Sequence, residues 1–161
     1  MEAKWLFGVE LEQIQVVVHP QSVIHSMVEY EDGAVIAQLG TPDMRLPIQY
    51  ALYYPNRRKM SGKRLNFYEL SSLTFEQPDT ETFQGLALAF EAMRQGGNIP
   101  TVYNAANEKA VALFLNRKIS FLEIPEIINA CMENSRYINS PTVEEILATE
   151  AETYAFIESR W

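Results

Sequence analysis

Two short runs of β-branched and apolar residues flank an Asp32-Gly33 pair, and this arrangement constrains the fold more than any other feature of the chain. The runs cover residues 23–30 and 34–39. An Asp-Gly pair between such runs favours a tight hairpin because both central residues can accept positive φ. A loop follows the second run, and Asp43 offers a carboxylate to cap a helix after it. This region therefore predicts strand, turn, strand, loop and helix.

The C-terminal half predicts four amphipathic helices over residues 83–161. Glycines 96–97 end the first helix, and the second spans about residues 100–117. A capping-box pattern of Ser120 and Glu123 starts the third helix. The fourth starts at Ser140-Pro141 or at Thr142, with Glu145 three residues after Thr142. Because the connections between these helices are short, we expect a small four-helix bundle.

The predicted fold class is α+β: a small, mainly antiparallel sheet with a helix, then a linker and the bundle. A β-branched run at residues 14–19 predicts a further strand, and weak alternation over residues 65–75 predicts an extended arm or an edge strand. The predicted domains are residues 1–57, which hold the sheet, residues 58–82, which form the linker arm, and residues 83–161, which form the helical domain.

Composition excludes several classes of protein. A net charge of −8 and a pI of about 4.8 argue against general nucleic-acid binding. No apolar run is long enough to span a bilayer, and no signal-peptide pattern is present.

The single cysteine, Cys131, fits a reducing compartment and predicts a buried, inert thiol. The basic run at residues 57–64 is interpreted as a solvated linker rather than a phosphate-binding loop, because it lacks a glycine-rich strand-to-helix turn.

The two histidines, His19 and His25, are the clearest candidates for chemistry. A metal site would need further ligands at compatible geometry, so none is predicted. From the residues alone, His25 is either a packing residue or a proton carrier that contacts substrate, since histidine is suited to proton transfer near neutral pH. Ser22 lies three residues before His25. On a strand that spacing places the two side chains on opposite faces, which disfavours a nucleophile-base pair.

Several separated motifs resemble the 1-deoxy-D-xylulose 5-phosphate reductoisomerase family, in the same order and over nearly the whole chain. They are HPQSVIHSMV (19–28), EDG (31–33), AQLG (37–40), PDMR-PI (42–48) and NAANEKAVALFL (104–115). The resemblance implies a C-terminal fragment that holds the end of the catalytic domain, the linker and the C-terminal helical domain. By the same resemblance, a cofactor-binding domain and an acidic metal site precede Met1.

The resemblance implies conversion of 1-deoxy-D-xylulose 5-phosphate to 2-C-methyl-D-erythritol 4-phosphate in non-mevalonate isoprenoid biosynthesis, by a cytoplasmic homodimer that uses NADPH and Mg or Mn. It places His25 beside the substrate and Ser22, Pro42 and Met44 in the substrate cleft. His19 is expected to be structural. With no cofactor or metal site of its own, the chain alone is expected to be inactive. The alternative is a structural or self-association module without an active site, and neither hypothesis involves nucleic acid or a membrane.

Overall fold

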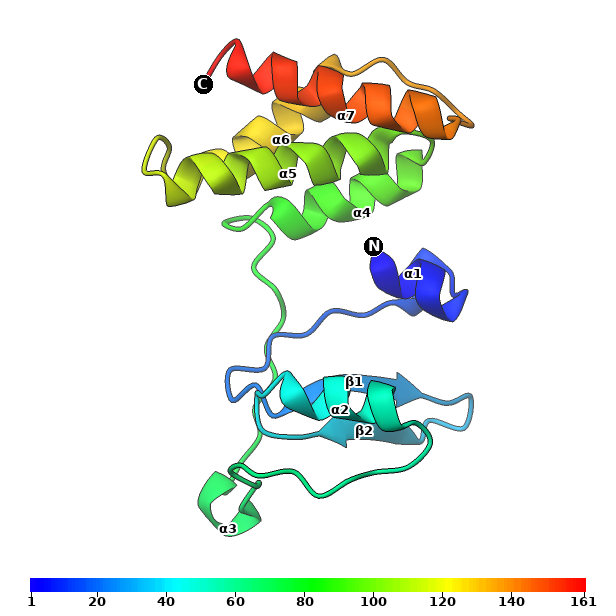
Figure 1. The fold of residues 1–161 in the computed structure, drawn as a ribbon, viewed down its shortest axis with the longest axis vertical. Coiled ribbons are helices and arrows are strands. Elements are labelled where there is room, and N and C mark those ends of the chain that lie inside the picture. Colours follow the sequence, from blue (N-terminus) through cyan, green and yellow to red (C-terminus); the bar gives the residue numbers. More distant parts are fainter. The chain divides into compact units, whose positions relative to one another are not determined.

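The computed structural model describes residues 1–161, which form two compact units. One unit, the helical unit, comprises Met1–Gln15 and Asp79–Trp161; the other, the hairpin unit, comprises Val16–Pro78. In chain order the helices and strands are α1 (Glu2–Phe7), a short 3-10 helix (Leu11–Gln13), β1 (Ile24–Glu29), β2 (Val35–Leu39), α2 (Arg45–Tyr53), α3 (Phe67–Leu70), α4 (Gly85–Gln95), α5 (Ile99–Leu115), α6 (Glu123–Asn134) and α7 (Val143–Glu158) (Figure 1). The predicted α+β fold class is confirmed.

The predicted hairpin is confirmed, with a different turn. Strands β1 and β2 pair antiparallel and form the only sheet. The Gly33 N–H donates to the Tyr30 carbonyl at 2.9 Å, and the Tyr30 N–H donates to the Ala34 carbonyl at 2.9 Å. Only Gly33 has a positive φ, 81°, so the expectation that Asp32 shares this conformation is wrong. The connection is a three-residue loop with glycine in its left-handed position.

Two predicted extended segments are mostly not strands. Within residues 14–19 only Val18 pairs with another segment, through two 2.9 Å backbone hydrogen bonds to Glu76. Within residues 65–75 the only regular element is the four-residue helix α3, whose first turn is capped by the Asn66 side chain. β-branched residues favour strands only where a neighbouring strand is available, and here the chain supplies one partner residue.

The four predicted C-terminal helices are confirmed. The capping box predicted at Ser120 is incomplete, because α6 begins at Glu123 with Leu122 as its N-cap residue and no side-chain cap. Gly96 ends α4 with φ 67°. Thr142 and Glu145 form a reciprocal capping box at the start of α7. At the start of α6, the Glu123 carboxylate accepts the Ser120 N–H at 2.7 Å. Helix α5 packs against α4, α6 and α7. None of the helices is both long and apolar enough to cross a membrane.

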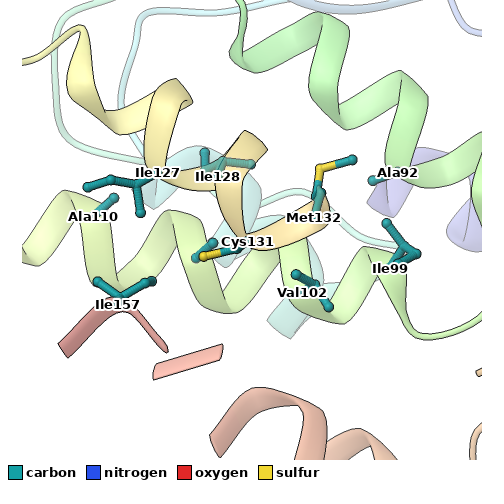
Figure 2. Close-up of a cluster of buried hydrophobic side chains, with 10 residues drawn as sticks. Ala92, Ile99, Val102, Ala110, Ile127, Ile128, Cys131, Met132 and Ile157 are labelled. Atoms are coloured by element: carbon teal, nitrogen blue, oxygen red, sulfur yellow. The ribbon is translucent and has the colours of Figure 1, made fainter. Parts of the chain in front are cut away.

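The core of the helical unit is a cluster of buried side chains between these helices (Figure 2). Its members are Ala92, Ile99, Val102, Ala106, Ala110, Ile127, Ile128, Cys131, Met132 and Ile157. Burial raises the pKa of the Cys131 thiol to about 11, which confirms the predicted buried thiol and keeps it protonated at neutral pH. Burying each large aliphatic side chain here contributes roughly 1.5–3 kcal/mol to folding.

The predicted domain boundaries stay a prediction. In the structure, residues 58–78 of the predicted linker belong to the same compact unit as the hairpin and α2. Hydrogen bonds join residues 18–21 to residues 74–76, near the end of this range. This part of the chain is therefore tied to the hairpin unit by specific hydrogen bonds, which a freely solvated linker would lack.

Candidate active site

A cavity of about 540 Å³ lies in the hairpin unit, bounded by the hairpin, the loop after β2 and helix α2. Its lining residues are Ser22, His25, Gln38, Thr41, Pro42, Asp43, Met44, Leu46, Pro47, Tyr50 and Arg57. All four predicted site residues, His25, Ser22, Pro42 and Met44, are among them. The structure brings these residues together, and their individual roles stay a prediction.

His25 enters the cavity from a β-bulge. The register pairs Ile24 with Leu39 and Ser26 with Gln38, so His25 is the extra residue on β1. A bulge re-aims a side chain and interrupts the strict alternation of strand faces. Ser22 itself precedes β1 and lies in a turn, so the alternation of strand faces does not relate it to His25. The expectation that the two side chains lie on opposite faces is wrong, since both line the same cavity. No hydrogen bond joins the two side chains, so the structure offers no serine-histidine nucleophile pair.

Ser22 has a backbone conformation that is uncommon for a residue with a side chain. Its φ is 50°, and its N–H donates to the His19 carbonyl at 3.0 Å, which closes a turn just before β1. Non-glycine residues in the left-handed region cost energy and concentrate at functional sites. Val23, the next residue, is buried, and its carbonyl accepts the Gly40 N–H at 3.0 Å. The position of Ser22 is thus fixed by the turn that precedes it and by the buried Val23 that follows it.

Gly40 gives the cavity wall its close packing. A Cβ at this position would lie 2.7 Å from Leu46 Cδ2 and 3.9 Å from His25 Nε2. The first distance is too short for carbon atoms in contact, so any side chain here would displace Leu46. Glycine therefore allows the end of β2 to approach the start of α2.

Asp43 is a structural member of the cavity wall. Its Oδ1 accepts the backbone N–H of Arg45 at 3.0 Å, as predicted for a carboxylate at the start of α2. The Arg45 guanidinium also binds this carboxylate, with 2.6 Å between Nη2 and Oδ2. These hydrogen bonds lower the pKa of Asp43 below its ordinary value. Its negative charge is therefore already compensated by Arg45.

Arg57 and Tyr50 were not predicted to belong to the site. The Arg57 guanidinium carbon lies 4.0 Å from the centroid of the Tyr50 ring, a cation-π contact, and Arg57 makes no ion pair. In the sequence, Arg57 belongs to the basic run at residues 57–64, which was interpreted as a linker. Nothing in that run indicates that Arg57 lines the cavity. Since Asp43 is paired, Arg57 leaves the cavity with an uncompensated positive charge.

His19 lies away from the cavity lining. Its Nδ1 is 2.8 Å from the Thr74 carbonyl, and its ring stacks on Phe75 with centroids 4.8 Å apart. These contacts agree with the predicted structural role.

The donor set of this chain does not fit a divalent metal. No three His, Cys, Asp or Glu side chains are grouped closely enough to hold an ion. The cavity has one carboxylate, Asp43, and it is occupied by Arg45. Mg²⁺ takes oxygen ligands in octahedral geometry, which one paired carboxylate does not provide. The sequence also has no glycine-rich fingerprint for a dinucleotide.

Comparisons with known proteins agree on one family. A profile described as the DXP reductoisomerase C-terminal domain matches residues 39–156. Over all 161 residues the chain is 69% identical to 1-deoxy-D-xylulose 5-phosphate reductoisomerase from Agathobacter rectalis. Over the same 161 residues, the chain is 66% identical to the enzyme of the same name from Lachnospira eligens. The chain spans 42% of the length of each of these two relatives.

Solved structures give the same result. The reductoisomerase from Zymomonas mobilis in complex with NADPH matches 98% of this chain with a TM-score of 0.90 and 44% identity, over 42% of its own length. A DOX-P reductoisomerase in complex with NADPH, fosmidomycin and magnesium matches 98% of the chain with a TM-score of 0.91 and 41% identity, over 41% of its length. The chain therefore belongs to the 1-deoxy-D-xylulose 5-phosphate reductoisomerase family and contains its C-terminal domain.

Proposed function

We propose that this chain forms the C-terminal part of an NADPH- and divalent-metal-dependent reductoisomerase that converts 1-deoxy-D-xylulose 5-phosphate to 2-C-methyl-D-erythritol 4-phosphate. The observation that carries the proposal is the single cavity lined by His25, Ser22, Pro42 and Met44. The relatives that share this part of the sequence carry the name of that enzyme, and one solved relative is a complex with NADPH and magnesium.

In this proposal the chain supplies one wall of the substrate site. His25 donates or accepts a hydrogen bond at the reacting sugar, and Ser22 adds a hydroxyl contact. Pro42 and Met44 supply a rigid and an adaptable apolar surface. Mg or Mn and NADPH, held by an upstream part of the enzyme, supply Lewis-acid and hydride chemistry when bound. The positive charge of Arg57 favours an anionic substrate in this cavity.

We also propose that the enzyme works as a cytoplasmic homodimer. The hairpin exposes Val28 and Ile36, which face each other across β1 and β2. Exposed apolar patches of this kind mark association surfaces. The lone buried cysteine fits a reducing compartment. Self-association without any catalytic role is the alternative function, and the same hairpin surface favours it.

The experiment that separates these functions measures NADPH oxidation with deoxyxylulose phosphate and magnesium. The 161-residue chain is compared with a chimera in which it follows the upstream part of the Agathobacter rectalis relative. We expect turnover by the chimera and none by the chain alone, with no tight binding of NADPH or Mg²⁺ to the chain in calorimetry. A chimera that folds without activity would contradict the proposed function, and micromolar NADPH binding by the chain would contradict the missing cofactor site.

The two histidines provide the sharper test in the same chimera. We expect His25→Ala to lower turnover by about a hundredfold, the scale of a lost proton-transfer group. His19→Ala is the comparison variant. It removes the same imidazole from outside the cavity, where the ring contacts Thr74 and Phe75, and it should lower turnover less than His25→Ala does. Equal, small losses for both variants would show that His25 is a packing residue.

A further inference from the structure

Two segments far apart in the sequence are joined beside the cavity, and we call them the clasp. One side comprises Val18, His19 and Gln21; the other comprises Thr74, Phe75 and Glu76. Gln21 Nε2 donates to Thr74 Oγ1 at 2.8 Å, and Gln21 Oε1 accepts the Thr74 N–H at 3.2 Å. The two residues therefore bind each other through both a side chain and the backbone.

Further contacts join the two segments of the clasp beside the Gln21-Thr74 pair. Val18 and Glu76 exchange two backbone hydrogen bonds of 2.9 Å. The His19 ring lies 2.8 Å from the Thr74 carbonyl through Nδ1 and stacks on Phe75 at an interplanar angle of 20°. Because the carbonyl can only accept, Nδ1 is the donor and carries the hydrogen. The other nitrogen, Nε2, is buried and has no partner, so the ring is held by the clasp alone.

The clasp leads directly to the cavity. The His19 carbonyl accepts the Ser22 N–H, so the turn held by the clasp ends at Ser22, whose φ is 50°. Such a conformation persists only where surrounding contacts over-determine it. Ser22 lines the cavity, and the bulged His25 follows three residues later. Fixing the turn therefore fixes where the first strand enters the cavity wall.

We propose that Thr74 is a positioning residue for this cavity. Through Gln21 and His19 it holds the turn that sets the backbone of Ser22, and through that backbone it sets the places of Ser22 and His25. Thr74 itself does not line the cavity. The kinetic consequence rests on the proposed function, whereas the structural consequence does not.

The structural test uses nuclear magnetic resonance on the 161-residue chain. Thr74→Val keeps the shape and removes the hydroxyl, and Thr74→Ser restores the hydroxyl. We expect Thr74→Val to move the Ser22 amide and His25 ring signals, and Thr74→Ser to leave both near their original positions. Thr101→Val in α5, where the hydroxyl makes no hydrogen bond, is the matched control. Unmoved Ser22 and His25 signals in Thr74→Val would overturn the proposal.

A second variant, Gln21→Met, removes the Gln21 hydrogen bonds to both the Thr74 hydroxyl and the Thr74 N–H, and it should move the same signals if Thr74→Val fails to fold. In the chimera we expect Thr74→Val to lower kcat/KM about tenfold, and Thr74→Ser to recover most of it, because small misplacements of site residues are costly. An unchanged kcat/KM in Thr74→Val would also overturn the proposal. An inactive parent chimera would count against the proposed function, and the resonance result would then decide on the clasp.

Discussion

The bundle of α4 to α7 and the hairpin unit bury their apolar side chains very differently. The bundle has a cluster of ten buried hydrophobic residues, most of them fully buried. In the hairpin unit only Val23 is a buried hydrophobic residue, while Val28 is 55% exposed and Ile36 is 62% exposed. The bundle therefore carries its own core, and the hairpin unit does not.

This difference shows where the chain depends on other surfaces. An isolated two-stranded hairpin is marginally stable, and it needs packing against another layer. The cavity nevertheless lies in the hairpin unit and is lined by the predicted site residues. The unit that carries the candidate site is thus the one whose stability depends on what covers it. The bundle can be perturbed by ordinary core mutations, whereas the hairpin should respond mainly to its partners.

The largest effect is expected from a core truncation in the bundle. Ile127 is fully buried in α6, and Ile127→Ala should lower the free energy of unfolding by about 2–5 kcal/mol. Ile36→Ala is the matched truncation on the hairpin and should cost about 0.5 kcal/mol or less. Native-state amide exchange, measured on each unit separately, gives both values. Equal costs would show that the hairpin has a packed core of its own.

Two glycines with positive φ, one in each unit, differ in how closely other atoms pack against them, and their alanine variants can therefore be compared. Gly97 in the bundle has φ 57°, and a Cβ there would lie 2.3 Å from the Ile138 carbonyl oxygen. Gly33 in the hairpin turn has φ 81° with nothing within 4 Å of its Cβ position. Gly33→Ala carries only the left-handed cost, roughly 1–2 kcal/mol. Gly97→Ala should cost about 1–3 kcal/mol more, measured by amide exchange. A loss of stability in Gly97→Ala that is no larger than the loss in Gly33→Ala would mean that the Ile138 segment moves away without cost.

Self-association tests what covers the hairpin. We expect the chain to dimerise through residues 14–39, because removing apolar side chains from water favours contact between copies. Ile36→Lys should shift sedimentation toward the monomer. Leu147→Lys on α7 is the matched control, since Leu147 is 59% exposed and the charge change is the same. A parent chain that stays monomeric into the high micromolar range would contradict this surface assignment.

Local signals predicted the helical half well. The Thr142 capping box and the Gly96 stop act within one helical turn, so the residues that decide the structure are adjacent in sequence. The same holds for the Gly33 turn, although a strict two-residue loop was the wrong type. In these places the prediction needed no knowledge of the rest of the fold.

The candidate site residues were predicted by resemblance more than by pattern, because the geometry of the cavity depends on distant contacts. The bulge that re-aims His25 leaves no signature in an apolar run. Arg57 reaches the cavity only after the chain has passed through α2 and turned back. The Gln21-Thr74 pair is separated by more than fifty residues, so no local rule predicts it. Periodicity finds elements, and only the folded chain shows which of their ends meet.

The smallest predicted effect concerns the two compensated carboxylates, one in each unit. Hydrogen bonds from Arg45 lower the pKa of Asp43, and those from Lys109 lower the pKa of Glu158. A lowered folded-state pKa contributes stability that is present above the ordinary value and is lost as the pH falls through the folded value. Glu158 is exposed and Asp43 is only partly buried beside an exposed Arg45, so the contribution of each pair to stability is small.

Arg45→Gln should therefore raise the pKa of Asp43 toward its ordinary value of 3.8, and the acid-induced loosening of the α2 start should move to higher pH. Carboxyl carbon shifts followed by nuclear magnetic resonance across the acid range measure this, with Glu158 in the same spectra as the internal reference. Lys109→Gln is the corresponding variant in the helical unit, and it should raise the pKa of Glu158 toward its ordinary value of 4.5. An Asp43 titration that does not change in Arg45→Gln would mean that the backbone N–H of residue 45, rather than the guanidinium, holds the carboxylate in its charged form. The wall of the cavity would then depend on the helix terminus alone, and the contrast between a self-sufficient bundle and a hairpin unit tied together by individual polar contacts would be weaker at this position.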